Sequence, residues 1–327
     1  MTSFKAQITR GKIIESLHEA KCIIKDSNFN TLLSSNNDKD LVFPRSSIKI
    51  FQAMPFIISG AHKKFNLSDK FIAIACSSHC GEKIHLKILN KWINSLKLNS
   101  NELLCGVHNP INQKSTNNLL LSGNLPSQLH NNCAGKHLAM VSGCLSKKLS
   151  YKNYVSFDHP YQKLIRNSLE YFTNESIQKK QIGIDGCNAP QYAFTMGGLA
   201  NSMINLVNNS NKNEYVKTSK ILLNAIKKNP LLIGGTKRFD SEIIKHTSGR
   251  IFCKAGAEGV ILFADCNKKI GGVIKIIDGN ERAIPPITMN IFSKLKILKS
   301  NEKKQLSHWR KPKLFNHANK KIGEITV

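Results

Sequence analysis

Apolar and polar residues alternate near both ends of the chain and recur at helical spacing between them. A hairpin is predicted around Arg10-Gly11, which separates two alternating runs. The predicted strands are 7–9, 12–16, 20–24, 250–254, 259–264 and 269–277, with one more edge segment in the tail. The predicted helices are 82–96, 136–145, 160–172, 197–207, 215–227, 239–246 and 286–298. The short apolar run 71–75 is predicted to be a buried strand or extended stretch.

This order of elements predicts a mixed α/β fold of the α+β type. We expect one antiparallel sheet, built from both chain ends, that is flanked by helices and carries a helical insertion. The whole chain, 1–327, would be a single catalytic unit, with the sheet from about 1–45 and 248–327 and a helical middle of about 46–247. The most linker-like stretch is 208–213.

The composition of the 327-residue chain is that of an ordinary globular protein, with 41% hydrophobic residues. No apolar run reaches the roughly 18 residues of a membrane span, and no secretory signal is visible at the N-terminus. We therefore expect a cytoplasmic protein without membrane contact. Its 9 cysteines are odd in number and lack paired spacing, which indicates reduced thiols rather than a disulfide framework.

The formal net charge of +27 indicates a possible polyanion partner. However, only 7 of the 48 cationic residues are Arg, the side chain that best reads bases and phosphates. The lysines are also spread along the chain. A solvated surface is the favoured interpretation, and no specific nucleic-acid partner is expected.

Ser46 and Lys49 form an S-x-x-K pair after the N-terminal strands, where a helix is predicted to begin. Residues three apart share a helix face, so the lysine amine can take the proton of the serine hydroxyl. The alternative is an N-capping serine with a solvated lysine, and the same spacing recurs elsewhere in this Lys-rich chain. Arg45, directly before the serine, could pair with a substrate carboxylate.

Two further motifs offer partners for this pair. Lys254-Ala255-Gly256 is similar to the K-T-G element of serine penicillin-recognising enzymes, although an exposed strand lysine with a turn glycine would look the same. Ser78 lies in a small polar loop and is a second nucleophile candidate. That loop could equally be the N-cap of the helix that follows.

Cysteines and basic residues suggest a soft metal site. From ligand preference alone, Cys133, Cys187 and His137 would be the choice for zinc, while buried reduced cysteines are the simpler alternative. A thiol–imidazole dyad of Cys133 and His137 is a further possibility.

Six motifs in this order resemble the asparaginase II family, the Rhizobium etli type of L-asparaginase, over nearly the whole chain. They are Arg45-Ser46-Ser47-Ile48-Lys49, Ser78-His79-Cys80-Gly81-Glu82, Cys105-Gly106-Val107-His108, Cys133-Ala134-Gly135-Lys136-His137, Asp185-Gly186-Cys187-Asn188-Ala189-Pro190 and Lys254-Ala255-Gly256-Ala257-Glu258-Gly259. The resemblance implies a fold similar to serine β-lactamases and glutaminases, a homodimer, and hydrolysis of L-asparagine to L-aspartate and ammonia.

The resemblance also implies roles for individual residues. Ser46 would be the nucleophile and Lys49 its base, with Ser78 and Lys254 as a second serine–lysine pair. A zinc ion that supports substrate binding would be held by Cys133, Lys136 and Cys187, with Lys136 a ligand in place of His137. Arg45, His137 and Asp185 would line the substrate pocket. Cys80 stands where a smaller or polar residue is expected.

Three competing functions remain open at this point. A β-lactamase-like acyl hydrolase would form a covalent adduct with penicillin, and a basic binding protein would keep salt-sensitive nucleic-acid affinity without Ser46. A zinc hydrolase would lose turnover on chelation. Asparagine and glutamine differ by one methylene, worth only about 1–3 kcal/mol in a fitted pocket, so the motifs do not fix the preference between them.

Overall fold

The computed structural model describes residues 4–35, 38–208 and 213–327. The chain forms two compact units. Unit 1 comprises Met1–Ser47, Phe194–Asn208 and Glu242–Val327, and unit 2 comprises Ile48–Ala193 and Asn209–Ser241. Of the predicted linker 208–213, positions 209–212 lie outside the described residues.

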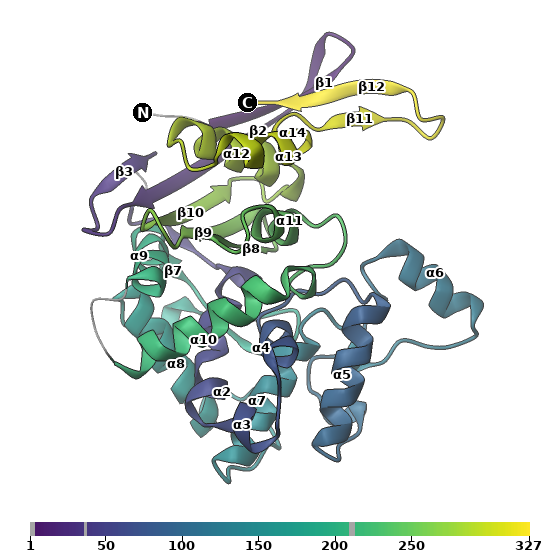
Figure 1. Cartoon of the computed structure of the whole chain (residues 1–327), viewed down its shortest axis with the longest axis vertical. Helices are drawn as coiled ribbons and strands as arrows, with labels where there is room; N and C mark the ends of the chain where they lie inside the picture. The colour runs from purple at the N-terminus through teal and green to yellow at the C-terminus, as the bar shows by residue number, and fades with distance from the viewer. Residues whose placement is uncertain (1–3, 36–37, 209–212) are drawn as a thin grey trace. The chain divides into compact units, whose positions relative to one another are not determined.

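Unit 1 is built around one antiparallel sheet with the strand order β11-β12-β1-β2-β10-β9-β8, and β3 pairs with β2 (Figure 1). The first and last strands of the chain are neighbours, because Gln7 pairs with Thr326. This confirms the predicted sheet from both chain ends. The strands are β1 (Phe4–Arg10), β2 (Ile13–Lys25), β3 (Thr31–Ser34), β8 (Ile251–Gly256), β9 (Val260–Asp265), β10 (Ile270–Ile276), β11 (Lys313–Phe315) and β12 (Lys321–Thr326), with a separate small pair of β4 (Leu41–Val42) and β7 (Phe194–Thr195).

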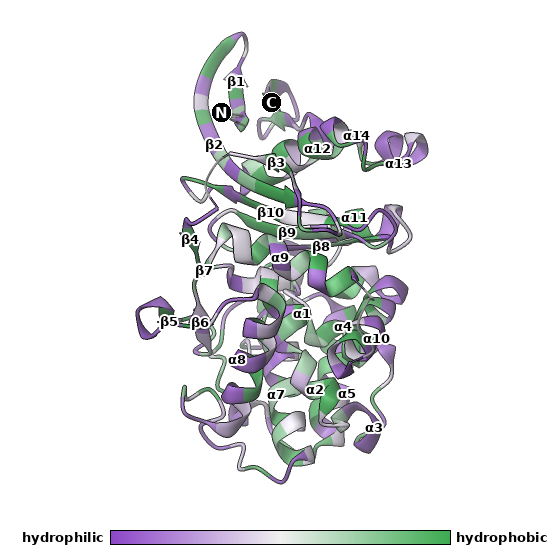
Figure 2. Ribbon diagram, turned by 90° about the vertical axis from the view of Figure 1, so that its left-hand side faces the viewer, coloured by the Kyte–Doolittle hydropathy of each residue, from purple (hydrophilic) through white to green (hydrophobic). Residues whose placement is uncertain are grey.

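Helices cover both faces of this sheet, as Figure 2 shows side-on: α9 (Met196–Val207) lies on one face and α12 (Ile284–Lys294) on the other. All six residues of β9 are buried, as expected for a strand covered on both faces. β1 instead begins with alternating buried and exposed residues. The unit also contains α13 (Ser300–Gln305) and α14 (Ser307–Arg310), while α11 (Phe239–His246) begins in unit 2 and ends in unit 1.

Unit 2 is mainly helical and has α7 (Ala134–Ser146) at its core, with residues 134–144 all buried. Helices α2, α4 and α5 pack on α7, and the short hairpin β5–β6 carries part of the candidate site. The other members are α1 (Lys49–Gln52), α2 (Met54–Ile58), α3 (Ala61–Lys64), α4 (Asp69–Ala75), α5 (Lys83–Ser95), α6 (Gln113–Leu121), α8 (Pro160–Thr173), α10 (Glu214–Lys228), β5 (Ile182–Ile184) and β6 (Pro190–Tyr192). Across the described residues, no helix is long and apolar enough to cross a bilayer.

One local prediction is wrong. The apolar run 71–75 is not a strand but most of helix α4, whose last four residues, 72–75, are buried between α7 and α10. Burial on several sides removes the polar face that would have revealed a helical period. The predicted helix start near Ser46 is confirmed, because Ser46 lies in a 3₁₀ turn, Arg45–Ile48, and α1 begins at Lys49.

Candidate functional site

In unit 1, Ser46 lies in a tight turn that follows Pro44. The Ser47 hydroxyl donates a hydrogen bond to the Pro44 carbonyl at 2.6 Å, and the Ser47 backbone N–H donates to the same oxygen at 3.1 Å. Arg45 adopts the left-handed conformation with φ 51°, which costs a non-glycine residue roughly 1–2 kcal/mol. Ser47 is buried, whereas Ser46 is partly exposed. The turn is therefore held through Ser47, and Ser46 remains partly exposed.

The K-x-G motif lies against this turn within unit 1. A Cβ on Gly256, at the end of β8, would lie 2.5 Å from the Pro44 carbonyl oxygen and 3.2 Å from the Ser46 backbone nitrogen. Only glycine permits so close an approach. Lys254, two residues earlier on the strand, is buried and its Nζ donates to the Ala255 carbonyl at 3.1 Å.

In unit 2, the fully buried Lys49 is surrounded by oxygen acceptors. Its Nζ donates to the Ser77 carbonyl at 2.6 Å, the Ser78 Oγ at 3.0 Å and the Asn132 carbonyl at 3.4 Å. The sequence pairs Ser78 with Lys254, whereas the contact found for the Ser78 hydroxyl is with Lys49. A buried amine in direct contact with a serine hydroxyl is the arrangement that proton transfer requires.

Backbone hydrogen bonds fix the loop that carries Ser78. The Ser78 N–H donates to the Ile233 carbonyl at 2.8 Å, and the Cys80 N–H donates to the Gly234 carbonyl at 3.0 Å. The Cys80 carbonyl accepts from the Asn112 N–H at 2.9 Å. Ser78 is thus held by a loop that is tied to two other segments of unit 2.

A second cluster in unit 2 joins α7 to the β5–β6 turn. The Lys136 Nζ lies 3.1 Å from the Cys187 Sγ and 3.9 Å from the Asp185 carboxylate. The Cys187 Sγ is 3.2 Å from the same carboxylate. A hydrogen bond from Cys133, working against burial, lowers the pKa of the Cys187 thiol to about 6. Burial alone would lower the pKa of Lys136, but the negative charges of Cys187, Cys133 and Asp185 together raise it.

This donor set fits a zinc ion. Donor atoms of Cys133, Asp185 and Cys187 all lie within 4.8 Å of one another, and thiolates are preferred zinc ligands. The Lys136 ammonium supplies the positive charge that the thiolate and carboxylate require. Zinc binding through the Lys136 amine must therefore displace a proton.

His137 is completely buried beside this cluster. Its Nδ1 lies 2.6 Å from the Tyr154 hydroxyl oxygen, which itself accepts the Leu104 N–H at 2.8 Å. His137 thus interacts with the Tyr154 hydroxyl through Nδ1, while its Nε2 is a buried atom without a hydrogen-bond partner among the described residues. Burial, with the charge of Lys136, lowers the pKa of His137 to about 3, so the ring is neutral. The contact to Cys187 is made by Lys136, while His137 is bound to Tyr154.

Two residues without a sequence signal connect these clusters. The Asn131 Oδ1 accepts the Cys133 N–H at 2.9 Å, and its Nδ2 donates to the Cys105 carbonyl at 2.7 Å. The Asn132 N–H donates to the His108 Nε2 at 3.0 Å, while the Asn132 carbonyl faces Lys49. The segment Cys105-Gly106-Val107-His108 thus holds the backbone that links the Lys49 cluster to the Cys133 cluster.

The family comparison agrees with these motifs. Among solved structures, the chain is similar to one from Bacteroides dorei DSM 17855 that is provisionally named a beta-lactamase, with 12% identity, a TM-score of 0.40, and 79% of this chain and 84% of that chain covered. Comparison with curated proteins finds no match. The family described as L-asparaginase II matches residues 6–327, nearly the whole chain. The chain therefore belongs to the L-asparaginase II family.

Proposed function

We propose that this protein hydrolyses the side-chain amide of L-asparagine to L-aspartate and ammonia through a serine acyl-enzyme. Family membership supports a hydrolase that acts on a small-molecule amide. The observation that carries the serine mechanism is the buried Lys49 amine, 3.0 Å from the Ser78 hydroxyl. A buried lysine in contact with serine hydroxyls can serve as a general base without histidine.

In the proposed reaction, Ser46 is the nucleophile and Lys49, three residues later in the chain, is its base. The Ser46 Oγ attacks the amide carbon, and its proton passes to Lys49, directly or through the Ser78 hydroxyl. The C–N bond then breaks, and the leaving ammonia takes up a proton. Lys49, Ser78 and Lys254 are the groups that would return this proton. Water hydrolyses the resulting ester to aspartate and restores the Ser46 hydroxyl. Backbone N–H groups near Ser46 would stabilise the oxyanion, a contribution of about 3–4 kcal/mol per donor.

The other cluster serves substrate binding in this proposal. Arg45 would pair with the α-carboxylate, Asp185 with the α-amine, and the buried Nε2 of His137 offers a further hydrogen-bonding group. Cys133, Lys136 and Cys187 would hold zinc, whose positive charge supports substrate binding. A homodimer is the assembly that the family resemblance suggests.

Ser78 is the second candidate nucleophile, because its hydroxyl is the one in contact with Lys49. In that case Ser46 would assist proton transfer. The overall reaction would be the same, but the acyl group would be attached to Ser78.

The test measures ammonia and aspartate release from L-asparagine and from L-glutamine by the wild type, Ser46→Ala and Ser78→Ala. We expect asparagine turnover by the wild type and a loss of about a thousandfold or more in Ser46→Ala. Ser300→Ala is the matched control, since Ser300 and Lys303 repeat the S-x-x-K spacing on the exposed side of α13. It should keep full activity.

Mass spectrometry of the protein quenched during turnover locates the acyl group. Acylation of Ser46 supports the proposal, and acylation of Ser78 exchanges the roles of the two serines. Full activity in both alanine variants would refute a serine mechanism. A penicillin adduct without asparagine turnover, or nucleic-acid affinity without any turnover, would favour the alternative functions.

A further inference from the structure

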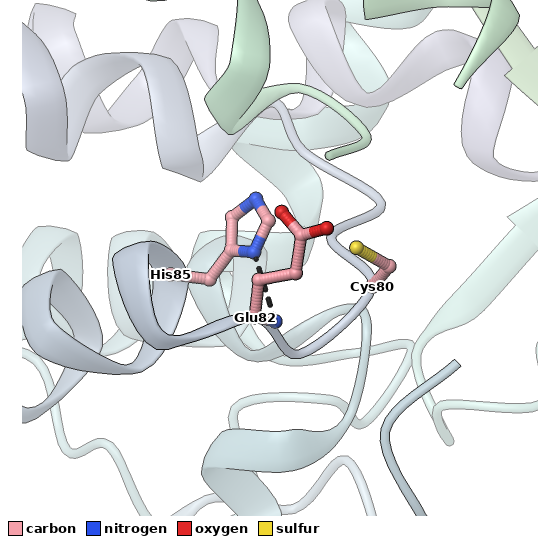
Figure 3. A group of neighbouring side chains, drawn as sticks. All are labelled: Cys80, Glu82 and His85. Carbon is pink, nitrogen blue, oxygen red and sulfur yellow. Dashed lines mark hydrogen bonds between the residues drawn. The ribbon is translucent and has the colours of Figure 1, made fainter. Parts of the chain in front are cut away.

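A second group of metal-ligand side chains lies in unit 2, at the start of α5. Figure 3 shows Cys80, Glu82 and His85, with the Glu82 carboxylate between the imidazole and the sulfur. One ligand atom from each residue lies within 4.8 Å of the other two. Cys80 and His85 are buried and Glu82 is partly buried. Thiolate, carboxylate and imidazole are the three ligand types that zinc accepts in proteins.

Local structure orients each of these ligands. Glu82 is the N-cap residue of α5, and its carboxylate accepts hydrogen bonds from the Asn112 amide at 3.1 Å and the Thr236 hydroxyl at 3.2 Å. The His85 Nε2 lies 3.2 Å from the Leu231 carbonyl, a partner that requires the ring proton on that nitrogen. A histidine that donates one N–H to a backbone carbonyl is typical of metal ligands, because the bond fixes the tautomer.

In this tautomer the His85 Nδ1 carries no proton, so its lone pair is available to bind a metal ion. Nδ1 accepts the Glu82 N–H at 3.2 Å, the dashed line in Figure 3. That hydrogen bond is long, near the upper limit for an N–H donor. Metal coordination would replace a weak contact rather than a strong one.

Residue 235 lies against all three side chains and is glycine. A Cβ at Gly235 would lie 2.2 Å from the Cys80 Sγ, 3.3 Å from a Glu82 carboxylate oxygen and 3.3 Å from the His85 Cε1. One added carbon would thus contact all three side chains at once. The backbone at Gly235 also has φ 122°, a conformation that side chains other than glycine rarely adopt.

We propose that Cys80, Glu82 and His85 bind a zinc ion, separate from the Cys133–Lys136–Cys187 cluster and from the asparagine chemistry. A Cys80 thiolate and a Glu82 carboxylate balance the two charges of Zn²⁺, and neutral His85 is the third ligand. The complex is therefore uncharged in a buried setting, where a net charge is costly. A water molecule completes the four ligands that zinc prefers.

Binding releases one proton per ion, because the Cys80 thiol exchanges its hydrogen for the metal. Burial, and then the nearby charge of Glu82, raises the pKa of Cys80 to about 11, so the metal-free thiol is protonated. Burial also lowers the pKa of His85, which keeps its imidazole neutral and able to coordinate. Zinc affinity should therefore rise with pH.

The bound ion would connect two segments of unit 2. Cys80 lies two residues after Ser78, and the loop between them is already hydrogen-bonded to the carbonyls of Ile233 and Gly234. Zinc would cross-link the start of α5 to this loop and make it more rigid. Its role would be structural, since no substrate atom needs to reach it.

Zinc counting on the full chain tests the proposal without any measurement of turnover. Protein stripped with a chelator is re-equilibrated with Zn²⁺, and bound zinc per chain is measured in a Cys187→Ser background that removes a ligand of the other cluster. We expect one zinc in Cys187→Ser and none in Cys80→Ser/Cys187→Ser. The matched control Cys266→Ser/Cys187→Ser, which changes the partly exposed Cys266, should retain one.

Two outcomes overturn the proposal: no zinc in Cys187→Ser, or an unchanged zinc content after Cys80 is replaced. Substitution with Co²⁺ in Cys187→Ser gives a second readout that does not depend on the folding of the Cys80 variant. A thiolate-to-cobalt charge-transfer band that is lost in Gly235→Ala supports the site, and a spectrum without such a band refutes it.

Discussion

The contact between Gly256 and the Ser46 turn can be tested with a single methyl group. In Gly256→Ala, the new Cβ would lie 2.5 Å from the Pro44 carbonyl oxygen and 3.1 Å from the Ser47 nitrogen. Favourable separations are about 3.5–4.0 Å, so the turn and β8 must move apart by roughly 1 Å. Both neighbours are backbone atoms, which cannot move aside by changing rotamer.

The displacement has two measurable consequences. Overpacking of this kind costs about 1–3 kcal/mol, which urea unfolding followed by circular dichroism would report as a lower free energy of unfolding. A shift of about 1 Å in a reacting group costs roughly a hundredfold in rate. We therefore expect kcat for asparagine to fall by about that factor in the fraction of Gly256→Ala that remains folded.

Gly197→Ala in α9 is the matched control within unit 1. Its Cβ would meet nothing closer than the Asp38 carbonyl at 3.2 Å, and alanine is favoured over glycine in a helix by about 1 kcal/mol. The control should change stability by no more than about 1 kcal/mol and leave kcat unchanged. If Gly256→Ala behaves like Gly197→Ala in both assays, β8 does not position the Ser46 turn and the reasoning is wrong.

Two other predictions concern stability. Arg250 bonds to the carboxylates of Asp265 and Glu302, and all three side chains are largely buried. Because Arg250→Met leaves both carboxylates unpaired, it should lower the free energy of unfolding by about 3–5 kcal/mol. A decrease below about 1 kcal/mol in urea unfolding would contradict this prediction. The pKa of His137, lowered to about 3 by burial and by Lys136, lies below the unfolded value of about 6.5, so the unfolded state binds more protons between these values. The free energy of unfolding of the chelator-treated protein should therefore fall as the pH decreases from about 6.5 toward about 3. His137 contributes at most about 1.4 kcal/mol per pH unit to this decrease. In His137→Gln, the free energy of unfolding should decrease less between about pH 7 and pH 5.

Most helices longer than two turns could be predicted from the sequence, including the buried α7, whereas the short run 71–75 was assigned the wrong structure. The helix predicted at 160–172 matches α8 to within one residue because it keeps an exposed polar stripe, and 239–246 matches α11 although most of its residues are buried. The run 71–75 has no such stripe within its last four residues and was predicted as a strand. The sheet from both chain ends was predictable because turn signals separate its strands, and β1 also begins with alternating buried and exposed residues.

Local motifs identified the chemical groups of the candidate site but not their partners. Nothing in the sequence indicates that Lys49 contacts Ser78, which is 29 positions away, because such pairing depends on how α1 and the loop after α4 fold. Asn131 gave no signal either, since a single asparagine before Cys133 is indistinguishable from one in any loop. The sequence thus specifies reactive side chains, and the packing of unit 2 decides which of them interact.

The strand order of the sheet also has a consequence for biosynthesis. β1 and β2 are made first, but their partners β12 and β10 belong to the last part of the chain. During translation, the N-terminal strands must therefore wait with unpaired edges while the helical unit, whose contacts are nearer in sequence, is already able to fold. A nascent chain in this state is a natural client for chaperones that shield exposed strands, and a ribosome stalled before β10 would present an aggregation-prone hairpin rather than a smaller version of the enzyme.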